Sequence, residues 1–191
     1  MVQVRDLHPI KTNGEIDINA WLEDLTVSLE IEDVSRIKLA CEITERALES
    51  AAENDDYWED TNIDCFRAGL EMAVILASLK VNEETLVAAI LYRSVRENKL
   101  PLDTVGKTFG PTIKQLINGV LQMAAISNLQ SPTRDNVLGQ TDGQLTNVRK
   151  MLVSLVDDVR VALIKLAERT CAIRAVKNSD RKKRYLVSRE V

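Results

Sequence analysis

The sequence of 191 residues contains a single histidine, His8, and this scarcity argues against hydrolytic sites that depend on imidazole groups. A catalytic triad needs an imidazole base beside its serine or cysteine, and helical metal-dependent hydrolases usually place several imidazoles around one ion. A lone histidine in an irregular N-terminal segment is typical of a surface residue. Glycine-rich phosphate loops such as GxxxxGK[ST] and GxGxxG are also missing, so no phosphate cradle is predicted.

Glycine (7), proline (4) and cysteine (3) are scarce too. Few glycines and prolines disfavour a β-rich fold with many turns. The cysteines, Cys41, Cys65 and Cys171, lie far apart without a CxxC pair, which indicates small buried thiols in a reducing compartment. No apolar run approaches the roughly 18 residues of a spanning helix, and the N-terminus has no signal pattern. We therefore expect a cytoplasmic protein that contacts no membrane.

The charge balance also argues against a nucleic-acid partner. Lys and Arg number 25 against 29 Asp and Glu, which gives a net charge of −4. A mildly acidic protein does not favour binding to phosphate backbones. We interpret the one basic cluster, Arg181 to Arg184, as the solvated start of a helix rather than a nucleic-acid patch.

The most ordered pattern lies between Asn147 and Lys177, which has no glycine or proline and is predicted to form one long core helix at about 144–176. Its apolar residues recur at three- and four-residue steps: Val148, Leu152, Leu155, Val159, Leu163, Leu166 and Ile173. A narrow polar stripe occupies the rest of the wheel: Lys150, Ser154, Asp157, Asp158, Lys165, Glu168 and Arg169. Such a stripe either faces water, which mixed charges favour, or lines a site.

Similar patterns predict an all-α domain of about eight helices. The other helices are expected at 17–30, 33–52, 62–79, 82–97, 102–109 and 112–126, and from 179 or 180 onward. Residues 1–16 are predicted to be irregular, and 127–143 to be a flexible loop, which at that length is usually functional or disordered. No stop signal precedes Val191, so we expect residues 180–191 to begin a helix that continues in a longer protein.

Three runs, RKMLVSLVDDVRVALIKLAER, VAAIL and LINGV, resemble the N-terminal domain of the long RelA/SpoT family, which makes and breaks the alarmone (p)ppGpp. The resemblance covers nearly the whole chain. The opening MVQVRDLHPI and the segment MAAI favour the RelA-type synthetase branch. The resemblance implies a single HD-type helical bundle over residues 1–191. In active members this bundle is a manganese-dependent phosphohydrolase.

The resemblance also places a vestigial hydrolase pocket, whose positions are Ala68, Tyr92, Arg93, Arg96, Glu97, Glu168, Cys171 and Ala172. Active members carry histidines at the positions of Ala68 and Tyr92, and a metal-binding aspartate at that of Arg93. Glu168 keeps a carboxylate at the last ligand position. One carboxylate among cations cannot hold a divalent ion tightly. We therefore expect no catalytic residue, no metal and no cofactor, the ancestral manganese site having been lost.

Two arrangements of the pocket stay open at this point. In the first, Arg93 or Arg96 reaches Glu168 and replaces the missing ion with a fixed positive charge, since a buried carboxylate needs a partner. In the second, both arginines point into water at the C-terminal end of their helix, where cations suit the helix dipole.

The function that the resemblance implies is that of an inactive, hydrolase-like regulatory domain in a RelA-type GTP pyrophosphokinase. Its expected partners are the synthetase domain of the full-length chain and, through other domains, the ribosome. The alternative is a nucleotide- or anion-binding effector module that uses Arg93, Arg96, Lys165 and Arg169. A residual phosphohydrolase using Glu97 and Glu168 is a third, disfavoured hypothesis.

Overall fold

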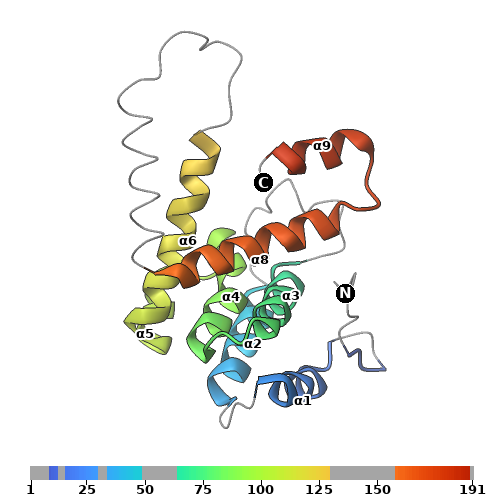
Figure 1. The fold of residues 1–191 in the computed structure, drawn as a ribbon. Coiled ribbons are helices and arrows are strands. Elements are labelled where there is room, and N and C mark those ends of the chain that lie inside the picture. Colours follow the sequence, from blue (N-terminus) through green and yellow to red (C-terminus); the bar gives the residue numbers. More distant parts are fainter. Residues whose placement is uncertain (1–8, 13–15, 30–33, 49–63, 130–157, 190–191) are drawn as a thin grey trace.

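The structure, a computed structural model, describes residues 9–12, 16–29, 34–48, 64–129 and 158–189. Within these ranges eight helices form a bundle and no strand is present, which confirms the predicted all-α fold (Figure 1). An isolated antiparallel bridge pairs Ile10 with Ile16. The helices are α1 (Ile18–Leu29), α2 (Ser35–Ala47), α3 (Cys65–Ser78), α4 (Glu83–Arg96), α5 (Leu102–Phe109), α6 (Pro111–Leu129), α8 (Val159–Ala175) and α9 (Arg181–Arg189). None of these helices is long and apolar enough to cross a membrane.

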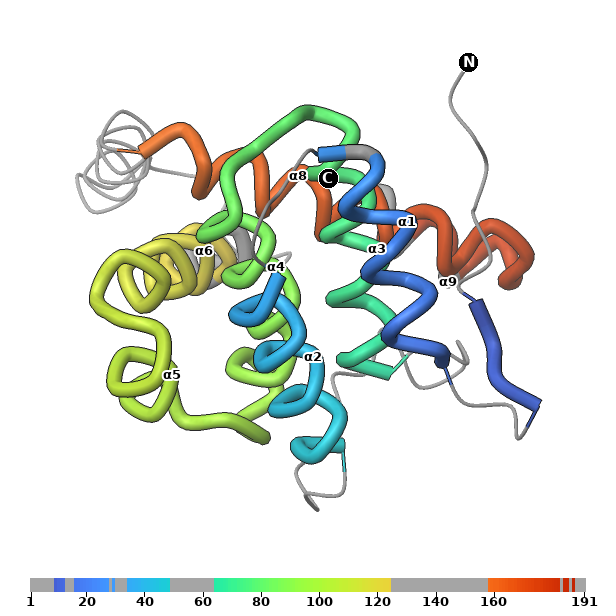
Figure 2. The backbone as a smooth tube through the Cα atoms, turned by 90° about the horizontal axis from the view of Figure 1, so that it is seen from below, coloured from blue at the N-terminus to red at the C-terminus, as the bar shows by residue number. Residues whose placement is uncertain are grey.

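The centre of the bundle is α4. Every residue from Thr85 to Val95 is buried, because α4 packs against α2, α3, α6 and α8. Figure 2 shows α4 enclosed between its neighbours. The prediction that the helix near 144–176 is the central one is therefore wrong, since α8 lies on the outside of the bundle.

The ends of α4 agree with the bounds predicted from the sequence, 82–97, to within one residue. The Asn82 side chain accepts a hydrogen bond from the backbone N–H of Thr85 at 3.3 Å, and Glu83 and Glu84 occupy the first turn. The helix ends at Arg96, and Asn98 follows it with a φ of 56°. Asparagine tolerates this left-handed conformation better than most residues.

A glycine sets the spacing between α3 and α4. A Cβ atom on Gly69 would lie 2.5 Å from the carbonyl oxygen of Ile90, so only glycine allows the two backbones to approach this closely. The hydroxyl of Ser94 lies 3.4 Å from Sγ of Cys65 at the far end of the same pair of helices. The close contact brings the C-terminal turn of α4 beside the start of α3.

Helix α8 begins later than predicted. Asp158 has an extended backbone, with φ −152° and ψ 106°, and its side chain accepts a hydrogen bond from the N–H of Arg160. An aspartate in this position caps a helix rather than continuing one. A single helix across 144–176 is therefore excluded at Asp158, and residues 144–157 lie outside the described part of the chain.

Two other predicted boundaries also differ. Helix α3 is capped by Asp64, which accepts from the N–H of Arg67 at 2.7 Å, whereas the predicted cap at 62 lies outside the described residues. Helix α6 extends to Leu129, so residues 127–129 are helical and not part of a loop. The rest of the predicted loop, 130–143, and residues 1–8 of the irregular start also lie outside the described ranges.

Candidate functional site

Helix α8 departs from an ordinary surface helix in two ways. It buries the charged residues Lys165, Glu168 and Arg169 beside apolar residues such as Ile164, and it exposes the large apolar residues Val159, Leu166 and Ile173. The interpretation of the polar stripe as a solvated face is therefore wrong for these three residues. A helix that turns charge inward must surround that charge with partners, because an unpaired buried charge is costly.

Glu168 is the centre of these partners. Its side chain is only 2% exposed. Arg96, from α4, donates a hydrogen bond to Oε1, and Nζ of Lys165, one turn back on α8, lies 2.6 Å from Oε2. Nη1 of Arg93 lies 3.9 Å from Oε1, and Nε of Arg169 lies 3.8 Å from Oε2. The first of the two arrangements left open by the sequence is the one observed.

A second carboxylate extends the network. Nη2 of Arg93 donates to Oε1 of Glu97 at 2.6 Å, and Nζ of Lys99 lies 3.2 Å from Oε2 of Glu97. All three side chains are buried. We call the combined set the Glu168 cluster: Arg93, Arg96, Glu97, Lys99, Lys165, Glu168 and Arg169.

The electrostatics of the cluster favour ionised side chains. Burial tends to raise the pKa of Glu168, but Lys165, Arg96 and Arg169 together hold it below its ordinary value. Burial lowers the pKa of Lys165, and the nearby Glu168 carboxylate partly restores it. The carboxylate of Glu168 is therefore an anion whose compensating charges come from the protein itself.

The other residues that the resemblance assigns to the pocket are buried on α3, α4 and α8. Tyr92 on α4 is fully buried, and burial together with the Glu168 charge raises its pKa. Ala68 is buried on α3, and Cys171 and Ala172 are buried on α8, one turn after Glu168. Helices α3, α4 and α8 all contact one another. The elements that the resemblance assigns to one pocket therefore do meet.

The residues present do not fit the manganese ion that the resemblance implies. A divalent ion at Glu168 would meet the ammonium of Lys165 and the guanidinium of Arg96, which occupy both carboxylate oxygens. The raised pKa of Tyr92 keeps its phenol protonated and a poor ligand. Among the described residues, no group of three or more His, Cys, Asp or Glu side chains could hold a metal ion.

Sequence reasoning missed part of the cluster. Lys99 lies beyond the end of α4 and has no periodic signal, although the turn at Asn98 directs the chain back toward Glu97. Lys165 and Arg169 were predicted as members of the polar stripe and as cations of the effector alternative, but not as partners of Glu168. The i,i+3 spacing of Lys165 and Glu168 was the available signal for pairing, whereas the adjacent Arg169 offered none.

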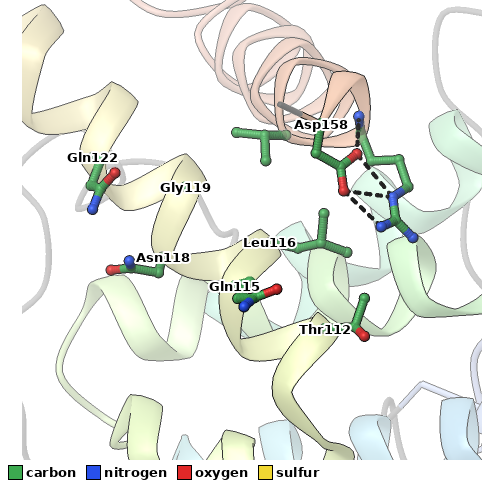
Figure 3. Close-up of a pocket in the computed structure, with 9 residues that line it drawn as sticks. Thr112, Gln115, Leu116, Asn118, Gly119, Gln122 and Asp158 are labelled. Carbon is green, nitrogen blue, oxygen red and sulfur yellow. Dashed lines mark hydrogen bonds and ion pairs between the residues drawn. The ribbon is translucent and has the colours of Figure 1, made fainter. Parts of the chain in front are cut away.

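A separate cleft of about 360 Å³ lies between the first half of α6 and the start of α8 (Figure 3). Its lining includes Thr112, Gln115, Asn118 and Gln122 of α6, together with Asp158. The guanidinium of Arg160 is held by Asp158 at 2.6 Å and by Glu84 of α4 at 3.1 Å, so this cation is already paired with two carboxylates. The cleft shares no residue with the Glu168 cluster, whose first residue on α8, Lys165, lies about 6 Å beyond Val161 along the helix.

The fold and this site define a class: an all-helical domain in which α3, α4 and α8 surround a buried charged centre. The sequence profile of the HD domain family matches residues 40–191, and the chain belongs to that family. The RelA/SpoT resemblance is confirmed by the curated relatives. The chain is 35% identical over 194 residues to a GTP pyrophosphokinase of Photobacterium angustum and 33% identical over 190 residues to that of Escherichia coli K12. It is also 33% identical over 119 residues to the bifunctional (p)ppGpp synthase/hydrolase SpoT of Escherichia coli K12.

These alignments cover a much larger share of this chain than of each relative. Both pyrophosphokinase alignments cover 100% of this chain but only 24% of the relative, and the SpoT alignment covers 62% of this chain and 16% of the relative. The chain thus corresponds to about a quarter of the length of the pyrophosphokinases it matches.

Proposed function

We propose that this chain is a catalytically inactive HD domain with a regulatory and structural role in a RelA-type GTP pyrophosphokinase of the stringent response. The whole protein would be cytoplasmic and would transfer pyrophosphate from ATP to GDP or GTP. Two observations support the parent activity: the HD family match and the pyrophosphokinase names of the relatives.

The single observation that carries the proposed inactivity is the pairing of Glu168 with Arg96 and Lys165. This carboxylate is the one ligand position that retains a metal-binding group, and two cationic side chains already occupy its oxygens. Replacing the ion by side-chain charge keeps the buried carboxylate compensated without a metal. The bundle would then fold without a metal and would not perform hydrolysis.

The proposed partner is the synthetase domain of the full-length protein, with the ribosome reached through other domains. Helix α9 supports this route, because it follows α8 after a short turn and packs against it. A rigid connection from the Glu168 cluster through α8 to α9 would fix the orientation of this domain relative to the proposed synthetase domain. This domain would bind neither nucleic acid nor membrane directly.

The test is manganese calorimetry at neutral pH, with pyrophosphate release from ppGpp followed on the same sample. The bifunctional SpoT of Escherichia coli is the positive control. We expect neither heat nor pyrophosphate from this chain. Tight manganese binding with turnover would overturn the proposal, and it would revive the residual phosphohydrolase based on Glu97 and Glu168.

Calorimetry also tests the alternative function, a nucleotide- or anion-binding effector module. Its cations Arg93, Arg96, Lys165 and Arg169 all contact carboxylates in the cluster, so an anionic ligand would have to compete with Glu97 and Glu168. Titration of ppGpp and GDP without metal distinguishes the two functions. Saturable heat that disappears in Lys165→Met would favour the effector module.

A further inference from the structure

The outward face of α8 is an apolar line on the surface of the bundle. Val159, Leu166 and Ile173 are 64%, 63% and 47% exposed, and they follow one another at seven-residue intervals. Seven residues turn an α-helix by about 20° less than two full turns, so the three side chains stand almost in one row. The hydroxyl of Thr170 donates a hydrogen bond to the carbonyl oxygen of Leu166 at 2.8 Å, so the donor of this hydroxyl is already paired within α8.

We call Val159, Leu166, Thr170 and Ile173 the α8 seam. Half-buried Ala162 borders it, and no charged residue lies within about 40° of Leu166 until Lys177 at the far end. Figures 1 and 2 show α8 running along the outer side of α3, α4 and α6. A helix that buries three charged residues on one face and exposes a row of apolar side chains on the other has the pattern of a contact surface.

We propose that the α8 seam binds a second copy of this chain, with the two α8 helices antiparallel around a two-fold axis at Leu166. The spacing of the seam is symmetric about this residue. Antiparallel pairing therefore places Leu166 against the partner's Leu166, and Val159 against the partner's Ile173. An isologous interface needs this kind of self-complementary surface.

The charges at the two ends of α8 favour the same orientation. At the start of α8, Asp158 and the neighbouring Glu84 of α4 surround the cation Arg160, which leaves a net charge of −1. The far end carries exposed Lys177, followed by exposed Arg181 and Lys182 of α9, and the exposed Asp180 offsets only one of these three cations. Antiparallel pairing sets the acidic end against the partner's basic end and opposes the two helix dipoles, whereas parallel pairing would bring like ends together.

One helix supplies less than the roughly 800 Å² per partner of a standard stable interface. We therefore expect a weak dimer, with a dissociation constant on the order of 0.1 mM. The proposal is independent of the catalytic state of the Glu168 cluster, so its failure would leave the proposed function untouched.

Sedimentation of the chain over a concentration series tests the dimer. The weight-average mass should approach twice the monomer mass at high concentration. Leu166→Glu should remain monomeric throughout, with an unchanged circular dichroism spectrum, because this side chain is exposed. Val27→Glu on α1 is the matched control, since Val27 is 85% exposed and lies off the seam; it should still dimerise. A monomer at every concentration, or a dimer that survives Leu166→Glu, would overturn the proposal.

Cysteine cross-linking under mild oxidation tests the geometry. Leu166→Cys should cross-link to its own copy, because it lies on the two-fold axis. Val159→Cys alone should not, since its copies would be about 21 Å apart, but a mixture of Val159→Cys and Ile173→Cys chains should form a heterodimer. The native cysteines are buried, so the unmodified chain gives the background. Self-cross-linking of Val159→Cys would contradict the antiparallel arrangement.

Discussion

Arg96 of α4 donates a hydrogen bond to Glu168 of α8 across 72 positions of sequence. The contact joins the central helix of the bundle to a helix on its outer side. Lys165 approaches the same carboxylate from α8 itself, so Glu168 is held from both helices. This relationship explains how a helix can carry its charge inward and still pack stably.

Arg96→Glu should destabilise the domain by about 3 kcal/mol or more, because it removes a partner of a buried carboxylate and adds a like charge beside it. Urea unfolding at neutral pH measures the change. Arg46→Glu on α2 is the control. Arg46 is 78% exposed and its ion pair with Glu42 is long, at 4.0 Å, so the substitution should lower the free energy of unfolding by less than about 0.5 kcal/mol. Equal effects in the two variants would show that the buried pair adds nothing to stability.

Acid should weaken the domain through Glu168. Its folded pKa lies below its ordinary value, so the ionised carboxylate contributes stability that is present above about pH 4.5 and is lost as the pH falls through the folded pKa. Unfolding free energies measured between pH 6 and pH 3 should therefore fall less steeply in Glu168→Gln than in the unmodified chain. Asp158, whose pKa is lowered by its hydrogen bonds from Arg160, titrates in the same direction and is unchanged in both proteins. Parallel slopes would contradict the role assigned to Glu168.

Much of the fold could be predicted from local signals. Asn82 with two acidic residues after it located the start of α4, and Gly110 before Pro111 separated α5 from α6. What the sequence could not supply was the direction in which α8 faces. Periodicity places Leu166 opposite Glu168, but it does not determine which of the two meets the core.

The site was predictable only in part for the same reason. The resemblance brought Tyr92, Arg93 and Glu168 together, and the structure places them on touching helices. Whether the arginines turn inward depends on long-range geometry that no local pattern records. Lys99 joins the cluster through a turn at Asn98, whose left-handed conformation became visible only in three dimensions.

Gly69→Ala should cost about 2 kcal/mol, because its Cβ would lie 2.5 Å from the Ile90 carbonyl oxygen and force α3 away from α4. The gain in helix propensity, about 1 kcal/mol, is smaller. Gly106→Ala in α5 makes the matched control, since its Cβ meets only the flexible Lys114 side chain and should leave stability equal or higher. Thermal melts of both variants measure the difference. A Gly69→Ala protein as stable as Gly106→Ala would mean that the close approach is not needed.

Restoring the lost ligands should restore metal binding if the vestigial positions are assigned correctly. The variant Ala68→His, Tyr92→His, Arg93→Asp and Arg96→Glu, with Glu168 kept, removes two cations and supplies two imidazoles and two carboxylates at the positions that the family resemblance indicates. Its folding is first checked by circular dichroism. At manganese concentrations of about 100 dissociation constants, binding should stabilise the variant by about 2.7 kcal/mol, seen as a raised melting temperature. The unmodified chain should show no shift, because Lys165 and Arg96 occupy its remaining carboxylate. A folded variant whose melting temperature does not change with manganese would show that Ala68, Tyr92 and Arg93 do not occupy the metal-ligand positions of the active family members.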